Sequence, residues 1–157
     1  MIEWIELLRW LHVIGAAVLL GTGAGIAFFM LMAHRTGDPA VIAHVAGTVV
    51  VADFLFTATA VILQPVTGIL LAEAVGWPLR TPWIVASLVL YVATGLCWLP
   101  VLWIQWRMRD LARVSAATNE QLPVSYRRLF RAWVVLGVPA FSFVLIILWL
   151  MLTRRMP

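Results

Sequence analysis

Four long stretches of the chain are almost entirely apolar, and this pattern restricts the fold more than any other feature. They run from Trp10 to Ala33, from Val49 to Ala72, from Trp83 to Trp106 and from Ala132 to Leu152. A transmembrane helix needs about 20 predominantly apolar residues. A chain in hydrocarbon must also satisfy its backbone polar groups internally, which helices do. The sequence therefore predicts an all-α bundle of four transmembrane helices.

We expect one integral membrane domain, residues 1–157, with helices at about 5–33, 40–74, 82–110 and 126–153. The pair Asp38-Pro39 is a good helix start and precedes the second apolar stretch by ten residues. The second helix should therefore extend beyond the membrane on the cytoplasmic side. Charged residues make up only 11% of the chain, against roughly a quarter in soluble domains, so a soluble globule is excluded.

All eleven basic residues are Arg, and the net charge is +4. They lie at the ends of the apolar stretches, where membrane topology requires positive charge, so we do not expect nucleic-acid binding. One side would hold Arg35, Arg107, Arg109, Arg113, Arg127, Arg128 and Arg131, and the other Arg9, Arg80, Arg154 and Arg155. This bias predicts a bacterial inner-membrane protein with both termini in the periplasm, although the Arg154-Arg155 pair argues against that orientation.

The first helix carries one ionisable residue within its apolar stretch, His12. At about 100° per residue, Gly15 and Gly23 share its side, which predicts a shallow face where a flat ligand could lie against the imidazole. The same residues could instead simply pack helices, with His12 bonded to a neighbouring group. The opposite side has Gly21 and Gly25, a spacing that allows close helix pairing and predicts a homo-oligomer contact.

The second helix places Asp53 and Gln64 on one polar side. Intramembrane ionisable residues are functional candidates by default, so Asp53 could relay protons, or it could be held by an Arg or by hydroxyl groups. Pro65 removes a main-chain hydrogen bond and could expose a carbonyl to a ligand. On the third helix, Ser87 and Tyr91 share a side. Tyr91 could bond a ligand or be satisfied by Gln64.

Helix rise puts His12, Gln64 and Tyr91 in one layer of the bilayer, which predicts a site between the first three helices. His34 and His44 flank the first connecting segment. They offer an alternative metal site, although no fixed ligand spacing supports it, and His44 lies on the side of its helix opposite Asp53.

Several segments resemble a bacterial family of predicted integral membrane proteins of unknown function. The resemblance covers nearly the whole chain and includes Trp10 to Ile14, Gly21 to Phe29, His34-Arg35, Ile62 to Pro65 with Gly68, Gly76 to Pro78, and Arg107 to Asp110.

A more distant similarity is to HemJ-type protoporphyrinogen oxidases and copper-resistance D-like membrane domains. It rests on the separation of His12 and His34, on Thr57 to Thr59, and on the segment that begins at Gly68. The HemJ resemblance implies haem b with His12 as an axial ligand. That group also carries a Lys four residues after a Trp, where this chain has Ser87, and this chain contains no Lys. The oxidase chemistry therefore cannot simply be transferred.

These observations favour a haem b-binding membrane protein. Such a protein could be an oxidoreductase that acts on a porphyrin, a quinone or another apolar reductant. The expected cofactor-binding residues are His12, Gly15, Gly23, Gln64 and Ser87, with His12 on the haem iron and with Asp53 and Tyr91 handling protons. The alternative is a non-enzymatic bundle that handles copper, with His34, His44 and Met30 as ligands, or that assists assembly of another membrane complex.

Overall fold

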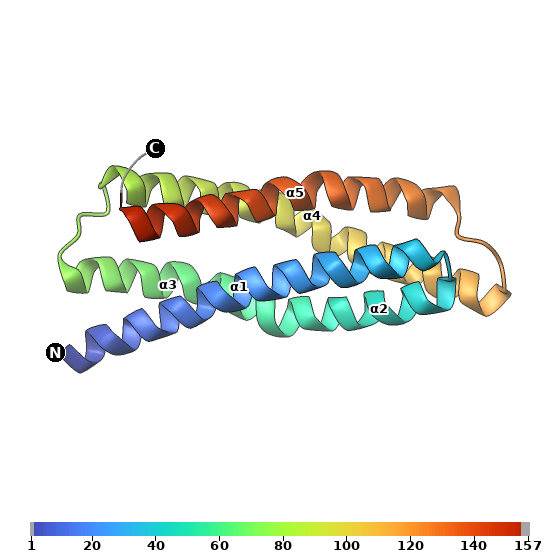
Figure 1. The fold of residues 1–157 in the computed structure, drawn as a ribbon, viewed down its shortest axis with the longest axis horizontal. Coiled ribbons are helices and arrows are strands. Elements are labelled where there is room, and N and C mark those ends of the chain that lie inside the picture. Colours follow the sequence, from blue (N-terminus) through green and yellow to red (C-terminus); the bar gives the residue numbers. More distant parts are fainter. Residues whose placement is uncertain (1, 155–157) are drawn as a thin grey trace.

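The chain is a bundle of four helical rods, seen in a computed structural model that describes residues 2–154 (Figure 1). The elements are α1 (Ile2–Thr36), α2 (Pro39–Ala52), the π-helical turn η1 (Asp53–Thr57), α3 (Ala58–Val75), α4 (Pro82–Thr118) and α5 (Val124–Thr153). No strand occurs in residues 2–154. The second rod is α2, η1 and α3 in succession. All four rods are long and apolar enough to cross a membrane, which confirms the predicted all-α architecture.

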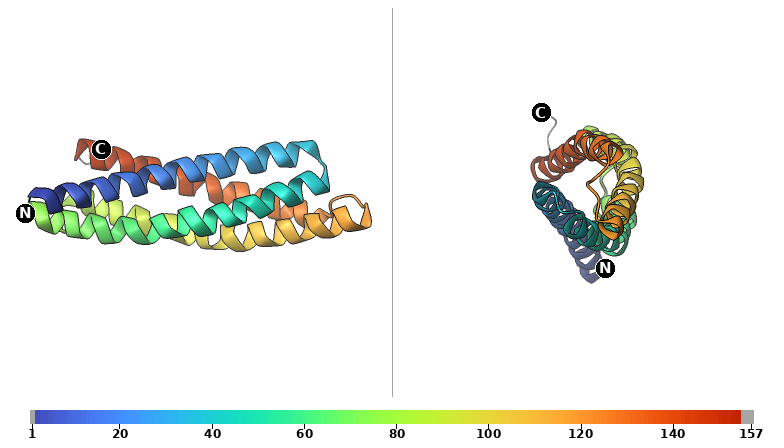
Figure 2. Two further views of the ribbon diagram at one scale, coloured as in Figure 1. Left: turned by 90° about the horizontal axis from the view of Figure 1, so that it is seen from below. Right: turned by 90° about the vertical axis from the view of Figure 1, so that its right-hand side faces the viewer.

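Neighbouring rods run in opposite directions, so the start of α1 and the end of α5 lie at the same end of the bundle (Figures 1 and 2). We call this end the terminal end. The opposite end, where residues 37–38 and 119–123 connect the helices, is the loop end. The second and third rods contain 37 residues each, about 55 Å of helix, whereas the hydrocarbon core is about 30 Å thick. Both rods are thus longer than one crossing requires.

The helix ends follow local chemistry. The Asp38 side chain accepts hydrogen bonds from the backbone N–H groups of Ala40 and Val41, which caps α2. Helix α4 continues past its expected end near residue 110 as far as Thr118. The added turns bury Ala112, so packing carries the helix past the point where the apolar stretch ends.

The main apolar core lies in the half of the bundle near the loop end. It consists of Ile26, Met30, Ala33, Ile42, Ala46, Val49, Val101, Ile104, Met108, Ala112, Tyr126 and Trp133. In the terminal half, α3 packs mainly on α1, and α4 packs mainly on α5, while α3 and α4 make little direct contact. Two of the buried side chains there are polar, Thr67 and Ser87. A larger share of the buried residues is therefore polar in the terminal half than in the half near the loop end, where Gln105 and Ser115 are buried beside many more apolar residues.

Candidate functional site

His12 on α1 is held by a cluster of polar contacts to α3. Its Nδ1 lies 3.0 Å from Thr67 Oγ1, and the Gln64 side-chain amide donates a 2.7 Å hydrogen bond to the His12 backbone carbonyl. Thr67 is 3% exposed, whereas His12 and Gln64 are half-buried. The predicted approach of His12 and Gln64 within one layer is confirmed, and the imidazole does bond a neighbouring side chain.

The hydroxyl of Thr67 determines which imidazole nitrogen carries the proton. This hydroxyl donates to the Leu63 carbonyl at 2.7 Å, so its oxygen lone pairs face His12. The hydrogen-bond network therefore assigns the proton to His12 Nδ1, which donates to Thr67. In that tautomer Nε2 keeps its lone pair, while the side-chain hydrogen bond of the ring is made through Nδ1.

Two glycines make this arrangement possible. A Cβ at Gly15 would overlap the Gln64 amide nitrogen, and a Cβ at Gly68 would lie 3.0 Å from His12 Cε1. The space beside these glycines is thus filled by the Gln64 and His12 side chains. Their lack of a side chain lets α1 and α3 approach and places the imidazole between them.

Pro65 explains the position of Tyr91. Because proline has no N–H, the carbonyl four residues earlier, at Val61, loses its usual helical donor. The Tyr91 hydroxyl on α4 donates to that carbonyl. The predicted exposed carbonyl therefore exists, but the fold itself satisfies it, and Tyr91 bonds Val61 and not Gln64.

The remaining expected ligand-binding residues have other neighbours. Ser87 is buried and donates to the Trp83 carbonyl at 2.8 Å. Gly23 lies near Phe141 of α5, whose ring carbon would be 3.8 Å from a Cβ at that position. The sequence interpretation missed Thr67 as a partner of His12. Its spacing of three residues from Gln64, on the same side of a helix, is the signal that could have indicated it.

Asp53 forms a second polar centre, at the π-helical turn in the middle of the second rod. Asp53 is only 3% exposed, and Thr57, Trp98 and Gln105 face its carboxyl group. Thr57 Oγ1, Trp98 Nε1 and Gln105 Oε1 are buried and have no hydrogen-bond partner within residues 2–154. Unpaired buried polar atoms are rare in native proteins and call for an explanation.

No arginine forms a salt bridge with Asp53 in the described part of the chain. The salt bridge present there joins Arg109 to Asp110. Of the two structural explanations for Asp53, an Arg partner is therefore wrong. A hydroxyl, an indole and an amide surround the carboxyl group instead. Such a carboxyl inside an apolar bundle is costly and marks a functional candidate.

His34 and His44 do not converge. His34 stacks on Phe130 with ring centroids 3.6 Å apart, and its Nδ1 lies 3.4 Å from the Tyr126 hydroxyl. His44 is exposed on α2, and Met30 is fully enclosed in the apolar core. Across the described residues, no three His, Cys, Asp or Glu side chains are grouped to hold a metal ion.

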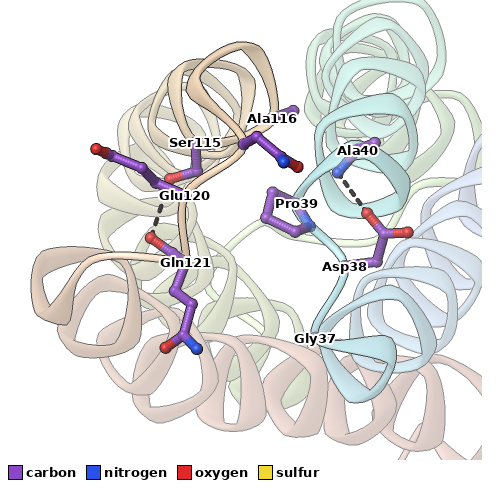
Figure 3. A pocket seen from close by; sticks show the side chains of 9 residues that line it. Gly37, Asp38, Pro39, Ala40, Ser115, Ala116, Glu120 and Gln121 are labelled. Carbon is purple, nitrogen blue, oxygen red and sulfur yellow. Dashed lines mark hydrogen bonds between the residues drawn. The ribbon is translucent and has the colours of Figure 1, made fainter.

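A small hollow at the loop end is a further place where a ligand could bind. It has a volume of about 230 Å³ and lies between Gly37–Ala40 and Ser115–Gln121 (Figure 3). The Asp38 carboxylate is engaged there in capping α2, and Ser115 Oγ lies 3.4 Å from the Gln121 carbonyl. These polar groups are used by the turns themselves, so this hollow is a weaker candidate than the His12 cluster.

Comparison with known proteins gives a family and no activity. Residues 6–155 match a family model described as a predicted integral membrane protein, DUF2269. No curated protein and no solved structure matches the chain. The match spans the four rods and both polar centres, and the family description agrees with the four apolar helices. The chain therefore belongs to the DUF2269 family of predicted integral membrane proteins.

Proposed function

We propose that this protein binds haem b in the membrane, with His12 as an axial ligand through Nε2. The observation that carries the proposal is the hydrogen bond between His12 Nδ1 and Thr67. Histidines that bind metals usually donate their other ring N–H to a fixed acceptor, which sets the tautomer and the ring orientation. Thr67 is such an acceptor because its own proton is committed to Leu63.

The fit of the surrounding residues is uneven. The donor chemistry of His12 suits haem iron, and α3 and α4 make little direct contact in this half of the bundle. However, the space beside Gly15 is already occupied by Gln64. In this proposal Gly15 and Gln64 therefore position His12, the residue that binds the iron. The predicted roles of Gly23 and Ser87 beside the cofactor rest on the sequence alone.

Bound haem supplies one-electron chemistry, and the protein supplies position and electrostatics. A porphyrin, a quinone or another apolar reductant is the proposed electron partner. Asp53 is the residue proposed to hold a proton, because its carboxyl group has no counter-charge among the described residues. Tyr91 is a weaker proton carrier, since its hydroxyl satisfies the carbonyl left free by Pro65.

The first test is the visible spectrum of protein expressed with ample haem. We expect a Soret band that changes on reduction with dithionite and that His12→Ala abolishes. Thr67→Val should retain haem but shift its reduction potential, because the imidazole loses its acceptor, whereas Thr67→Ser should resemble the original protein. A purified protein without a Soret band would overturn the proposal. A potential unchanged in Thr67→Val would remove Thr67 as a positioning residue.

A second proposal, self-association of the chain, is supported by the open face of α1. A Cβ at Gly21 or at Gly25 would meet no atom within 4 Å, so another helix could approach there. We propose that this face pairs with a second copy of the chain. Light scattering of the detergent-solubilised protein, with Gly21→Leu as the variant, distinguishes a dimer from a monomer. Stoichiometric copper without haem would instead favour the metal-handling alternative at His34 or His44.

For the location, we propose the bacterial inner membrane with both termini in the periplasm. The support is the excess of Arg at the loop end over the terminal end, because short cytoplasmic segments carry most of the positive charge.

A further inference from the structure

A groove on the outside of the bundle near the loop end combines positive charge with apolar surface. It lies between α2 and α4 and has a volume of about 630 Å³. Its lining includes Arg109 and Arg113 from α4, and His44, Gly47, Val50 and Val51 from α2. None of these residues belongs to the His12 or Asp53 clusters, so this inference does not depend on haem binding.

The guanidinium groups of the groove are not fully neutralised by the protein. Arg109 Nη2 lies 2.8 Å from Asp110, while Arg113 has no carboxylate within ion-pair distance among residues 2–154. Arg113 also lies close to the α2 backbone, since its Nη2 would be 3.7 Å from a Cβ at Gly47. The absence of a side chain at Gly47 therefore leaves the groove open beside an unpaired cation.

The position of the groove along the bundle corresponds to a membrane boundary. Trp106 is exposed, and the Arg109 guanidinium lies 6.0 Å from the centroid of its ring. Tryptophan is enriched at the level of the lipid headgroups. Val51, which is 56% exposed, lies farther along α2 towards the apolar middle of the second rod. The groove thus passes from a cationic part to an apolar part in the direction of the bilayer centre.

We propose that this groove binds an anionic phospholipid, with its phosphate at Arg109 and Arg113 and an acyl chain along Val50 and Val51. Guanidinium groups bind phosphate through charge-assisted, often bidentate, hydrogen bonds. Basic pockets between transmembrane helices near the membrane surface are suited to anionic headgroups. A lipid uses both parts of the groove, whereas a soluble phosphate compound would leave the exposed valines in contact with water.

The test is the thermal unfolding of the purified protein in detergent, followed by Trp fluorescence while phosphatidylglycerol is added. We expect phosphatidylglycerol to raise the unfolding temperature, phosphatidylethanolamine to raise it less, and glycerol phosphate to leave it unchanged. Arg113→Gln should raise the half-saturating phosphatidylglycerol concentration about tenfold, as expected for the loss of a strong charge-assisted contact. The half-saturating concentration of Arg113→Lys should fall between those of the original protein and Arg113→Gln, because Lys keeps the charge and loses the planar geometry.

The matched control is the double variant Arg127→Gln and Arg128→Gln, which removes two exposed charges at the loop end outside the groove. It should change the half-saturating concentration less than Arg113→Gln does. Gly47→Leu, which fills the groove without changing the charge, should weaken binding as well. Equal losses in the double variant and in Arg113→Gln would overturn the site in favour of general surface charge. Equal stabilisation by glycerol phosphate would overturn the lipid as its occupant.

Discussion

Pro65 and its neighbours show how one residue that breaks helical hydrogen bonding organises a contact between three helices. The missing N–H leaves the Val61 carbonyl without its helical donor, and Tyr91 from α4 supplies the replacement. One residue before the proline, Gln64 reaches α1 and donates to the carbonyl of His12. The segment of α3 around Pro65 is thereby bonded to both α1 and α4.

Gly15 lies directly against the Gln64 side chain, so a larger residue at this position should lower the stability of the protein. Gly15→Ala should lower the free energy of unfolding in detergent by about 1–3 kcal/mol, because the new methyl group would displace the Gln64 amide. The matched control is Gly95→Ala on α4, where a Cβ meets nothing within 4 Å and the change should stay within about 1 kcal/mol. Thermal unfolding compares the two. Equal stability of both variants would show that the Gln64 contact is dispensable.

The π-helical turn lies between two buried faces of the second rod, one in α2 and one in α3. Asp53–Thr57 adopts i to i+5 hydrogen bonding, with the Ala58 N–H donating to the Asp53 carbonyl. Such a turn accommodates one extra residue in an α-helix and often marks a functional site. Here it lies between Ile42, Ala46 and Val49, which pack into the loop-end core, and Gln64 and Thr67, which contact α1. The turn sets the rotation of one face relative to the other.

Deletion of one residue should therefore be tolerated in this turn and should damage the fold in the regular helix beside it. Deletion of Leu55 would remove the extra residue and leave α2 and α3 in nearly the same relative rotation, whereas deletion of Ile62 from regular α3 would rotate the two buried faces by about 100° relative to each other. With Ile62 deleted, either the loop-end core or the His12 contacts would be lost, at a cost of at least about 2 kcal/mol. Leu55→Ala is the control, because Leu55 is 57% exposed and a surface change usually costs about 0.5 kcal/mol or less. Equal losses in unfolding temperature on deletion of Leu55 and on deletion of Ile62 would contradict this role.

The whole bundle is asymmetric along its axis. The loop end contains the continuous apolar core and the seven Arg residues of the two connections and the adjoining helix ends. The terminal half contains the His12 cluster, and in it α3 and α4 make little direct contact. A well-packed half can fix the helices in place, so the other half can be more polar without loss of the fold. Asp53 lies between the two halves.

Reporter fusions test the proposed orientation of this asymmetric bundle. Alkaline phosphatase, which is active only in the periplasm, should be active when fused after residue 157 and inactive when inserted between residues 119 and 123. Green fluorescent protein, which does not fluoresce when exported unfolded, should give the opposite pattern. The reverse result would invert the orientation, while equal results at both positions would contradict the antiparallel arrangement of α4 and α5.

The sequence alone determined the four spans, because apolar stretches of this length have no other stable structure in hydrocarbon. It also indicated that His12 and Gln64 share a layer, since depth follows from helical rise. It could not show that Gln64 fills the space beside Gly15, that Tyr91 completes the bonding of Val61, or that Arg113 faces Gly47. Those contacts depend on how the rods are rotated and which of them are neighbours, and the π-helical turn and the packing between helices decide both.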